Sequence, residues 1–346
     1  MRWRQLITSI FLFLFGALGT YASSKGTASA PCPRFAYIKI NGGAGLGHQV
    51  VDVAIGLTFA FQHRAEFLYD QRGFQSNGYH GAYPWLPRYL GLDKARSVAD
   101  TAASGEVRHK IVTRAWQTRI SGCNIMIEGC EQCCYRLADP SGDNTWCQLT
   151  SVGLFHAVQE QFRAWFAESD PAAKSGLALM YNESIVNVAW HVRNGDVILL
   201  KDRLFYDTLM SEIRNIVGAR KVHYYFFSER PLAQTHPFIL EYADTTLLHE
   251  MSEQLTFHHF VFADVLVTSG SSFPAAAAML NSGIVLQAPN KDDVYGVIEL
   301  FDQGIVNASG SLLRPSAQQL SFNLQLHLQK KSSCTANDAF ACSHLA

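Results

Sequence analysis

Short apolar segments alternate with helical segments along the second half of the chain. Five segments are predicted to be strands, at 185–190, 222–227, 245–248, 265–268 and 284–287. Three segments with helical patterns lie among them, at 205–217, 253–260 and 274–281. Strands that alternate with helices pair in parallel through right-handed crossovers. This alternation predicts an α/β fold built on a parallel sheet.

The first half of the chain opens with a similar unit. The sequence predicts a strand at 35–40, a glycine-rich loop at 41–49, a helix at 50–64 and a strand at 66–69. Residues 72–148 are interpreted as loops and insertions. A strand–loop–helix–strand unit is typical of the opening of a doubly wound sheet.

These patterns predict two domains. We expect a first domain at 34–170 with a cysteine-rich insertion, a second at 171–315 and a polar tail at 316–346. A linker is expected at 168–175. Two such halves facing one another place a ligand in the cleft between the carboxyl ends of their strands.

The composition excludes two classes of protein. Apolar residues make up 48% of the chain and charged residues 16%, which excludes a disordered chain. Lys and Arg number 28 against 29 Asp and Glu, so the formal net charge is -1. Without a global basic field, we expect no nucleic-acid partner.

The N-terminus resembles a targeting segment. Arg2 and Arg4 precede an apolar run at 6–22, which is about as long as the shortest membrane-spanning helices. Residues 1–33 are therefore interpreted as a signal anchor followed by a short stalk, with a cleaved signal peptide as the alternative. Either interpretation sends the rest of the chain into the secretory lumen.

The cysteines agree with a luminal location. There are eight, and five cluster at Cys123, Cys130, Cys133, Cys134 and Cys147. Disulfides are favoured in an oxidising lumen, whereas a zinc site would need two ligand pairs and only Cys130-x-x-Cys133 supplies one. Asn182 and Asn307 begin N-glycosylation sequons, which predict a glycoprotein.

The first motif that carries chemistry is the glycine-rich loop, NGGAGLGHQ at 41–49. Its glycines, among them Gly45 and Gly47, allow a ligand to approach the backbone closely. A dinucleotide fingerprint fails on register, because His48 stands where the last glycine of one register would be. The loop therefore favours an anion at the start of the following helix over a nicotinamide or flavin.

The second motif, HVRNGD at 191–196, directly follows a predicted strand. It presents His191, Arg193 and Asp196 at the strand's carboxyl end. Arg193 suits a diphosphate because its guanidinium fork binds two oxygens and keeps its charge. The alternative is a surface turn with an ion pair between Arg193 and Asp196.

The third motif ends another predicted strand, DVLVTSGSSFP at 264–274. Ser271, Ser272 and Phe273 precede Pro274, which is suited to the first position of a helix. The serine amides and hydroxyls are suited to phosphate oxygens, and ordinary N-capping is the alternative.

Together, in this order and spacing, the three motifs resemble the metal-independent fucosyltransferase superfamily. The resemblance spans roughly residues 35–290 and rests on Gly47-His48-Gln49, on His191, Arg193 and Asp196, and on Ser271, Ser272 and Phe273. It implies a GT-B-like fold, in which two Rossmann-like domains face each other across a cleft. Asn194 stands where many members of the family have a second arginine.

The resemblance also implies roles for these residues. Arg193 would hold the diphosphate of GDP-fucose and stabilise its charge as it leaves. His191, Asp196, Ser271, Ser272 and Phe273 would line the nucleotide site, with Gly45, Gly47 and His48 approaching from the first domain. No Asp-x-Asp pair occurs in the sequence, so we expect neither a metal nor another cofactor.

The expected reaction is an inverting transfer of fucose from GDP-fucose to a hydroxyl of a glycan or glycoprotein. The resemblance favours Asp202 as the general base, with Asp52 and His48 as alternatives. A solvated loop acid is the structural alternative for Asp202.

We expect a type II Golgi membrane protein with a luminal catalytic domain, or else a protein of the ER lumen or a secreted one. Two other functions stay open, namely a catalytically inactive glycan-binding protein and a dinucleotide-binding oxidoreductase.

Overall fold

The structure is a computed structural model that describes residues 35–39, 45–62, 65–75, 82–99, 111–112, 124–128, 154–195, 201–288, 304–307 and 309–333. All of these residues belong to one compact unit, Pro33–Ala346. The predicted anchor segment at 1–33, all eight cysteines and Asp196 lie outside the described residues. Within the described ranges, every helix falls short of the length and apolar character needed to span a bilayer.

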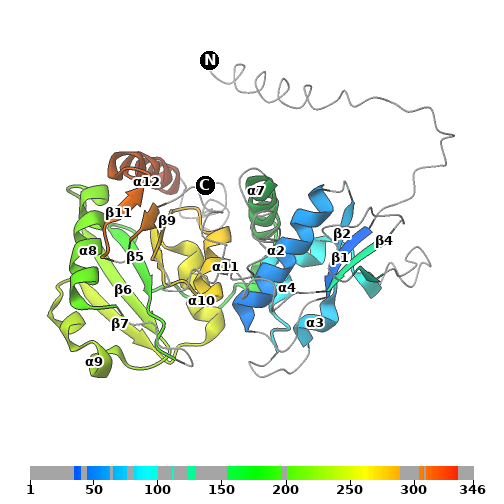
Figure 1. The fold of residues 1–346 in the computed structure, drawn as a ribbon, viewed down its shortest axis with the longest axis horizontal. Coiled ribbons are helices and arrows are strands. Elements are labelled where there is room, and N and C mark those ends of the chain that lie inside the picture. The colour runs from blue at the N-terminus through cyan, green and yellow to red at the C-terminus, as the bar shows by residue number, and fades with distance from the viewer. Residues whose placement is uncertain are drawn as a thin grey trace, which may run out of the picture. The chain divides into compact units, whose positions relative to one another are not determined.

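A four-stranded parallel sheet occupies the first half, in the order β2-β1-β4-β3. Figure 1 labels β1, β2 and β4 of this sheet. Its strands are β1 (Phe35–Lys39), β2 (Glu66–Tyr69), β3 (Ile111–Val112) and β4 (Asn124–Glu128). The strands predicted at 35–40 and 66–69 are confirmed. The interpretation of 72–148 as loops is wrong at β3 and β4, because β4 lies between β1 and β3 and pairs with both. Its sequence, NIMIE, is too short for a clear periodic pattern.

The helix that follows β1 begins earlier than predicted. α2 (Leu46–Gln62) starts four residues before the expected position 50, inside the predicted glycine-rich loop. Its first turn is closed by the amide of Gln49, which donates to the carbonyl of Gly45 at 3.2 Å. His48 therefore lies in the first turn of a helix. The other helices of this half are α3 (Gln71–Gln75), α4 (Leu86–Leu90), η1 (Leu92–Lys94) and α7 (Leu154–Ala167).

The second half contains a seven-stranded sheet in the order β11-β10-β9-β8-β5-β6-β7. Figure 1 labels five of its strands, β5, β6, β7, β9 and β11. All neighbours are parallel except β10 and β11. The five strands predicted here are confirmed to within one residue at each end. The strands are β5 (Val186–His191), β6 (Val222–Ser228), β7 (Thr245–His249), β8 (Val265–Thr268), β9 (Ile284–Gln287), β10 (Gly304–Val306) and β11 (Leu312–Arg314).

Helices cover both faces of this sheet, as expected for parallel strands. The elements are η2 (Pro171–Ala173), α8 (Arg203–Val217), α9 (Leu232–Thr235), η3 (Pro237–Glu241), α10 (Glu253–Phe262), α11 (Ser272–Leu280) and α12 (Ala317–Ser332). One core cluster joins the sheet to α8 and α12, and the other joins it to α10 and α11. The second cluster also contains residues of α2, α4 and α7. The elements of the first half therefore share a core with α10 and α11.

The alternation of side chains along β5 decides which face each residue occupies. Val188 and Trp190 pack in the α8 and α12 cluster, whereas Ala189 packs in the α10 and α11 cluster. His191 follows Trp190, so it lies on the same face as Ala189. Its ring there meets Phe260 of α10 and Phe273 of α11, at centroid distances of 5.7 and 6.2 Å.

The segment predicted as a polar tail at 316–346 contains the sixteen-residue helix α12. Leu320 and Leu324 of this helix are buried in the core cluster that also contains α8. Only two of its side chains are fully buried, so the apolar pattern was too sparse to indicate a helix. α12 is therefore an integral part of the layer over the second sheet.

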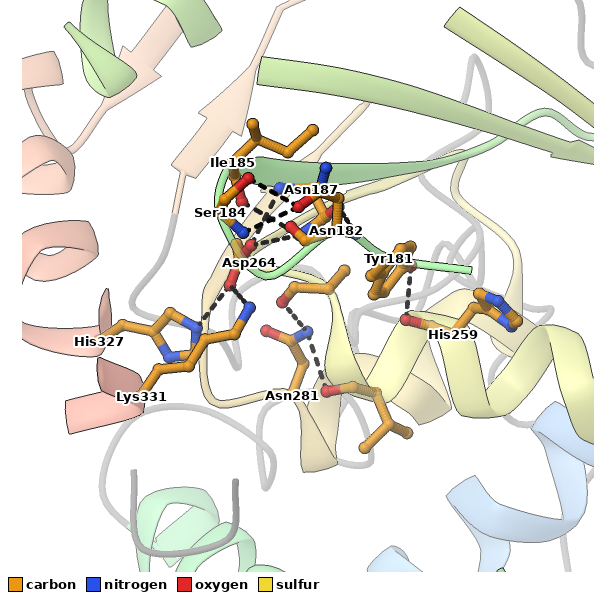
Figure 2. Close-up of polar contacts among 12 residues, drawn as sticks. Tyr181, Asn182, Ser184, Ile185, Asn187, His259, Asp264, Asn281, His327 and Lys331 are labelled. Atoms are coloured by element: carbon orange, nitrogen blue, oxygen red, sulfur yellow. Dashed lines mark hydrogen bonds and ion pairs between the residues drawn. The ribbon is translucent and has the colours of Figure 1, made fainter. Parts of the chain in front are cut away.

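Asp264, the residue before β8, attaches α12 to the sheet (Figure 2). Its carboxylate is fully buried. Oδ1 accepts hydrogen bonds from Nε2 of His327 at 3.1 Å and from Nζ of Lys331 at 2.8 Å. Oδ2 accepts from the backbone amide and the side-chain Nδ2 of Asn187, at 2.9 and 3.1 Å. Both oxygens are thus used within the protein, at the amino ends of β5 and β8, which indicates a structural role.

Candidate functional site

The sheet brings the second and third sequence motifs together. β5 and β8 are neighbouring parallel strands in which Trp190 pairs with Val267. The residues that follow the two strands therefore meet at one edge of the sheet. Nδ1 of His191 lies 2.5 Å from Oγ of Ser269, so a direct hydrogen bond joins the two motifs.

His191 is held as a neutral imidazole. Its side chain is buried, with 8% of the residue exposed. Burial and, second, the positive charge of Arg193 lower the pKa of His191 to about 3. Near neutral pH the ring therefore carries one proton, donates through one nitrogen and accepts through the other.

Arg193 is half-buried and lies two residues beyond the end of β5. The backbone before it is held by the amide of Val192, which donates to the carbonyl of Phe227 at 2.8 Å. After it, the buried Asn194 donates from Nδ2 to Oγ1 of Thr235 at 3.2 Å. Asn194 thus anchors the segment that carries Arg193.

The third motif forms the start of α11. The helix begins at Ser272, two residues before the predicted start, and Ser271 caps it by accepting from the amide of Phe273 at 3.4 Å. Gly270 makes the turn between β8 and the cap with a φ of 71°, a left-handed conformation that favours glycine. The structure confirms the N-capping that stood as the alternative for Ser271, and both serines are buried. The first amides of a helix have no partner within it and attract anions.

The first motif meets the third one. Nδ1 of His48, in the first turn of α2, lies 3.2 Å from Oγ of Ser272. At Gly47 the two helices are so close that an added Cβ would lie 2.4 Å from the amide nitrogen of Phe273. Glycine at this position therefore permits the contact between α2 and α11. Gly45, just before α2, is half-buried.

The structure places Asp202 at the start of α8. Asp202 is exposed and caps α8, where its Oδ1 accepts from the amide of Phe205 at 2.9 Å. Asp196 lies outside the described residues. Among the residues that the structure describes, no group of three or more His, Cys, Asp or Glu is placed to hold a metal ion.

Sequence reasoning missed Ser269, and it gave no role to the two histidines of α10. Ser269 lies within the third motif, and the pairing of β5 with β8 is what places it against His191. His258 and His259 are both buried in α10. His258 bonds through Nδ1 to the hydroxyl of Tyr89 at 2.9 Å, and Nε2 of His259 accepts from the amide of Met180 at 3.1 Å.

The arrangement has the parts that an anionic ligand requires. It combines the cation of Arg193, the neutral imidazole of His191 and the amino end of α11. Arginine and helix amides both bind phosphate oxygens. The pairing of β5 with β8 brings these groups to the carboxyl edge of the sheet, where ligands of α/β proteins bind.

No protein-family model and no curated protein matches the chain. Similar solved structures include the Bradyrhizobium α-1,6-fucosyltransferase NodZ soaked with GDP-fucose, at 12% identity and a TM-score of 0.43, covering 72% of this chain and 93% of NodZ. Another is a mutant of Arabidopsis thaliana FUT1 in complex with GDP, at 11% identity and a TM-score of 0.38, covering 82% and 75% of the two chains. A third is a family 9 glycosyl transferase from Veillonella parvula, at 10% identity and a TM-score of 0.38, covering 88% and 99%.

Proposed function

We propose that this chain is an inverting glycosyltransferase that moves fucose from GDP-fucose to a hydroxyl of a glycan or glycoprotein. The observation that carries the proposal is the meeting of the three motifs, through the bond between His191 and Ser269 and the contact between His48 and Ser272. Motifs that resemble those of one family and lie far apart in the sequence thus contact one another in the fold. The fold we propose is accordingly GT-B-like, with the nucleotide at the carboxyl edge of the second sheet.

In this proposal Arg193 neutralises the diphosphate of the donor. As the bond between fucose and GDP breaks, negative charge grows on the leaving phosphate, and a fixed cation beside it lowers the barrier. The first turn of α11, with Ser271, Ser272 and Phe273, supplies further donors to phosphate oxygens. These groups take the place that a metal ion has in metal-dependent transferases, so the reaction needs no cofactor.

The acceptor hydroxyl attacks the anomeric carbon of fucose and transfers its proton to a general base. The resemblance favours Asp202 for this role, with Asp52 and His48 as alternatives, and the contact of His48 with Ser272 favours His48 among these two. Asp202→Asn tests the first candidate, because asparagine caps α8 as well as aspartate does. We expect unchanged stability and a kcat lower by roughly 10²-fold or more. An unchanged kcat in Asp202→Asn would mean that another group accepts the proton of the acceptor hydroxyl. In that case His48→Gln should lose turnover.

A nucleotide screen tests the donor directly. At about 100 times its dissociation constant, a ligand adds roughly 2.7 kcal/mol to the free energy of unfolding, which raises the melting temperature measurably. We expect GDP and GDP-fucose to raise it in the presence of EDTA, and UDP or NADH to leave it unchanged. Stabilisation by NADH alone would favour the oxidoreductase. The inactive glycan-binding protein would be favoured by a different result. In that case the protein would bind GDP but would release no GDP from GDP-fucose when a glycan mixture is present.

We also propose, from the sequence of residues 1–33, that the chain is anchored in the Golgi membrane with its catalytic part in the lumen. Arg2 and Arg4 precede the apolar run and would stay on the cytoplasmic side. Protease protection of the catalytic part in intact microsomes is the expected result. Digestion without detergent would contradict this orientation.

A further inference from the structure

We infer that Ser269 is a positioning residue whose hydroxyl donates to Nδ1 of His191 and so keeps the proton of the imidazole on Nε2. His191 then offers an N–H donor to an oxygen of the bound nucleotide. The inference rests on the proposed function, because the nucleotide is the one proposed above. Ser269 is not among the residues that the resemblance assigns to the site.

The fold leaves little freedom for this pair. His191 ends β5 and Ser269 follows β8, and these two strands are locked in register through Val188, Ala189 and Trp190. Phe260 and Phe273 contact the imidazole ring. The ring therefore keeps its Nδ1 edge on Ser269 and cannot readily present that edge to a ligand.

The distance between the two atoms favours the hydroxyl as the donor. Oγ of Ser269 and Nδ1 of His191 are 2.5 Å apart. N–H···O hydrogen bonds cluster near 2.9–3.0 Å, whereas O–H···O bonds cluster near 2.7–2.8 Å and extend down to about 2.5 Å. An O–H that donates to the ring nitrogen fits the short separation better than an N–H that donates to the hydroxyl.

The tautomer matters because the imidazole is neutral. A neutral imidazole has one donor and one acceptor nitrogen, so an acceptor at Nδ1 makes Nε2 the donor. A donor is the group that a phosphate or hydroxyl oxygen requires beside Arg193, whereas a nitrogen lone pair would repel a phosphate oxygen. Without the serine hydroxyl, Nδ1 would lose the partner that it has among the described residues, and a fraction of the protein would present the other tautomer.

Nitrogen-15 NMR of the full-length chain labelled at histidine measures the tautomer before any ligand is added. His191→Gln identifies the signals of His191 among the 13 histidines. We expect Nε2 to carry the proton in the wild type and the proton to be shared between both nitrogens in Ser269→Ala. Ser269→Thr keeps the hydroxyl and should restore the tautomer of the wild type.

Calorimetric titration with GDP measures the consequence. We expect Ser269→Ala to bind GDP about tenfold more weakly and Ser269→Thr to recover most of that affinity. Ser316→Ala is the matched control, since it removes a capping hydroxyl from α12 and should leave GDP affinity unchanged.

Two results would overturn the inference. One is a wild-type His191 that carries its proton on Nδ1, and the other is a Ser269→Ala variant that binds GDP as tightly as the wild type. If the wild type binds no GDP at all, the proposed function is what fails. The tautomer measured in the ligand-free protein still decides whether Ser269 sets the protonated nitrogen.

Discussion

Arg193→Ala should lower kcat/KM for fucose transfer by at least about a hundredfold, which corresponds to about 2.7 kcal/mol of transition-state stabilisation. The physical reason is that the leaving diphosphate loses the cation that neutralises it, and no metal ion is proposed to replace that cation. The melting temperature should stay close to that of the wild type, because Arg193 is half-buried and belongs to neither core cluster. Initial rates with GDP-fucose and a melting curve measure the two effects.

Arg193→Lys is the matched variant. Lysine keeps the positive charge but lacks the guanidinium fork that binds two oxygens, so we expect an intermediate loss. The alanine variant should also raise the pKa of His191, because the charge of Arg193 is one of the two causes that lower it to about 3. Burial, the larger cause, should still hold that pKa below its ordinary value. Full turnover by the alanine variant would remove the role proposed for Arg193.

Asp264→Ala should lower the free energy of unfolding by about 3–5 kcal/mol, the usual cost of removing one partner from a buried ion pair. The substitution leaves His327, Lys331 and the buried amide of Asn187 without their acceptor. It also opens a cavity between β8 and α12. Lys331→Met should cost less, since about a third of its side chain is exposed. Urea unfolding of both variants provides the comparison.

The same network predicts how stability depends on pH. Burial alone would raise the pKa of Asp264, but the hydrogen bond from His327 and the charge of Lys331 outweigh it and hold that pKa below its usual value. A carboxyl whose folded pKa is lowered stabilises the fold above its unfolded pKa, near 3.9, and loses that contribution as the pH falls through its folded pKa. The wild type should therefore lose stability below about pH 4 more steeply than Asp264→Ala. Parallel curves for the two proteins would show that the fold does not lower the pKa of this carboxyl group.

Much of the second half could be predicted from the sequence because its strands are buried on both faces. VLVT at 265–268 and IVLQ at 284–287 each begin with three apolar residues and are buried along their whole length, and their limits match the structure. The meeting of the second and third motifs follows from neighbouring parallel strands that end at one edge. The hydrogen bond from Ser269 to His191 depends on the strand order, which no local pattern specifies.

Other parts of the fold depend on tertiary contacts that leave a weak trace in the sequence. α12 buries only Leu320 and Leu324 and attaches to the sheet through Asp264, so it resembled a polar tail. The glycines at 42–47 predict a loop. The structure places Gly47 inside α2, where the absence of a side chain lets the helix approach the backbone of Phe273.

Lys174 gives a similar lesson about the predicted linker at 168–175. Its Nζ donates to the backbone carbonyl of Phe166 at 2.6 Å. The same Nζ lies 3.6 Å from the centroid of the Phe166 ring. Burial lowers the pKa of Lys174 to about 7. A lysine in a polar segment indicates a solvated chain, and only the packed structure shows that this one is buried.

The central claim is that the diphosphate of the donor binds between Arg193 and the first turn of α11. A crystal structure of the protein with GDP measures this directly. The account predicts diphosphate oxygens within hydrogen-bonding distance of the guanidinium of Arg193 and of the amides at the start of α11. GDP bound at another edge of the sheet, with Arg193 turned away from its phosphates, would contradict it.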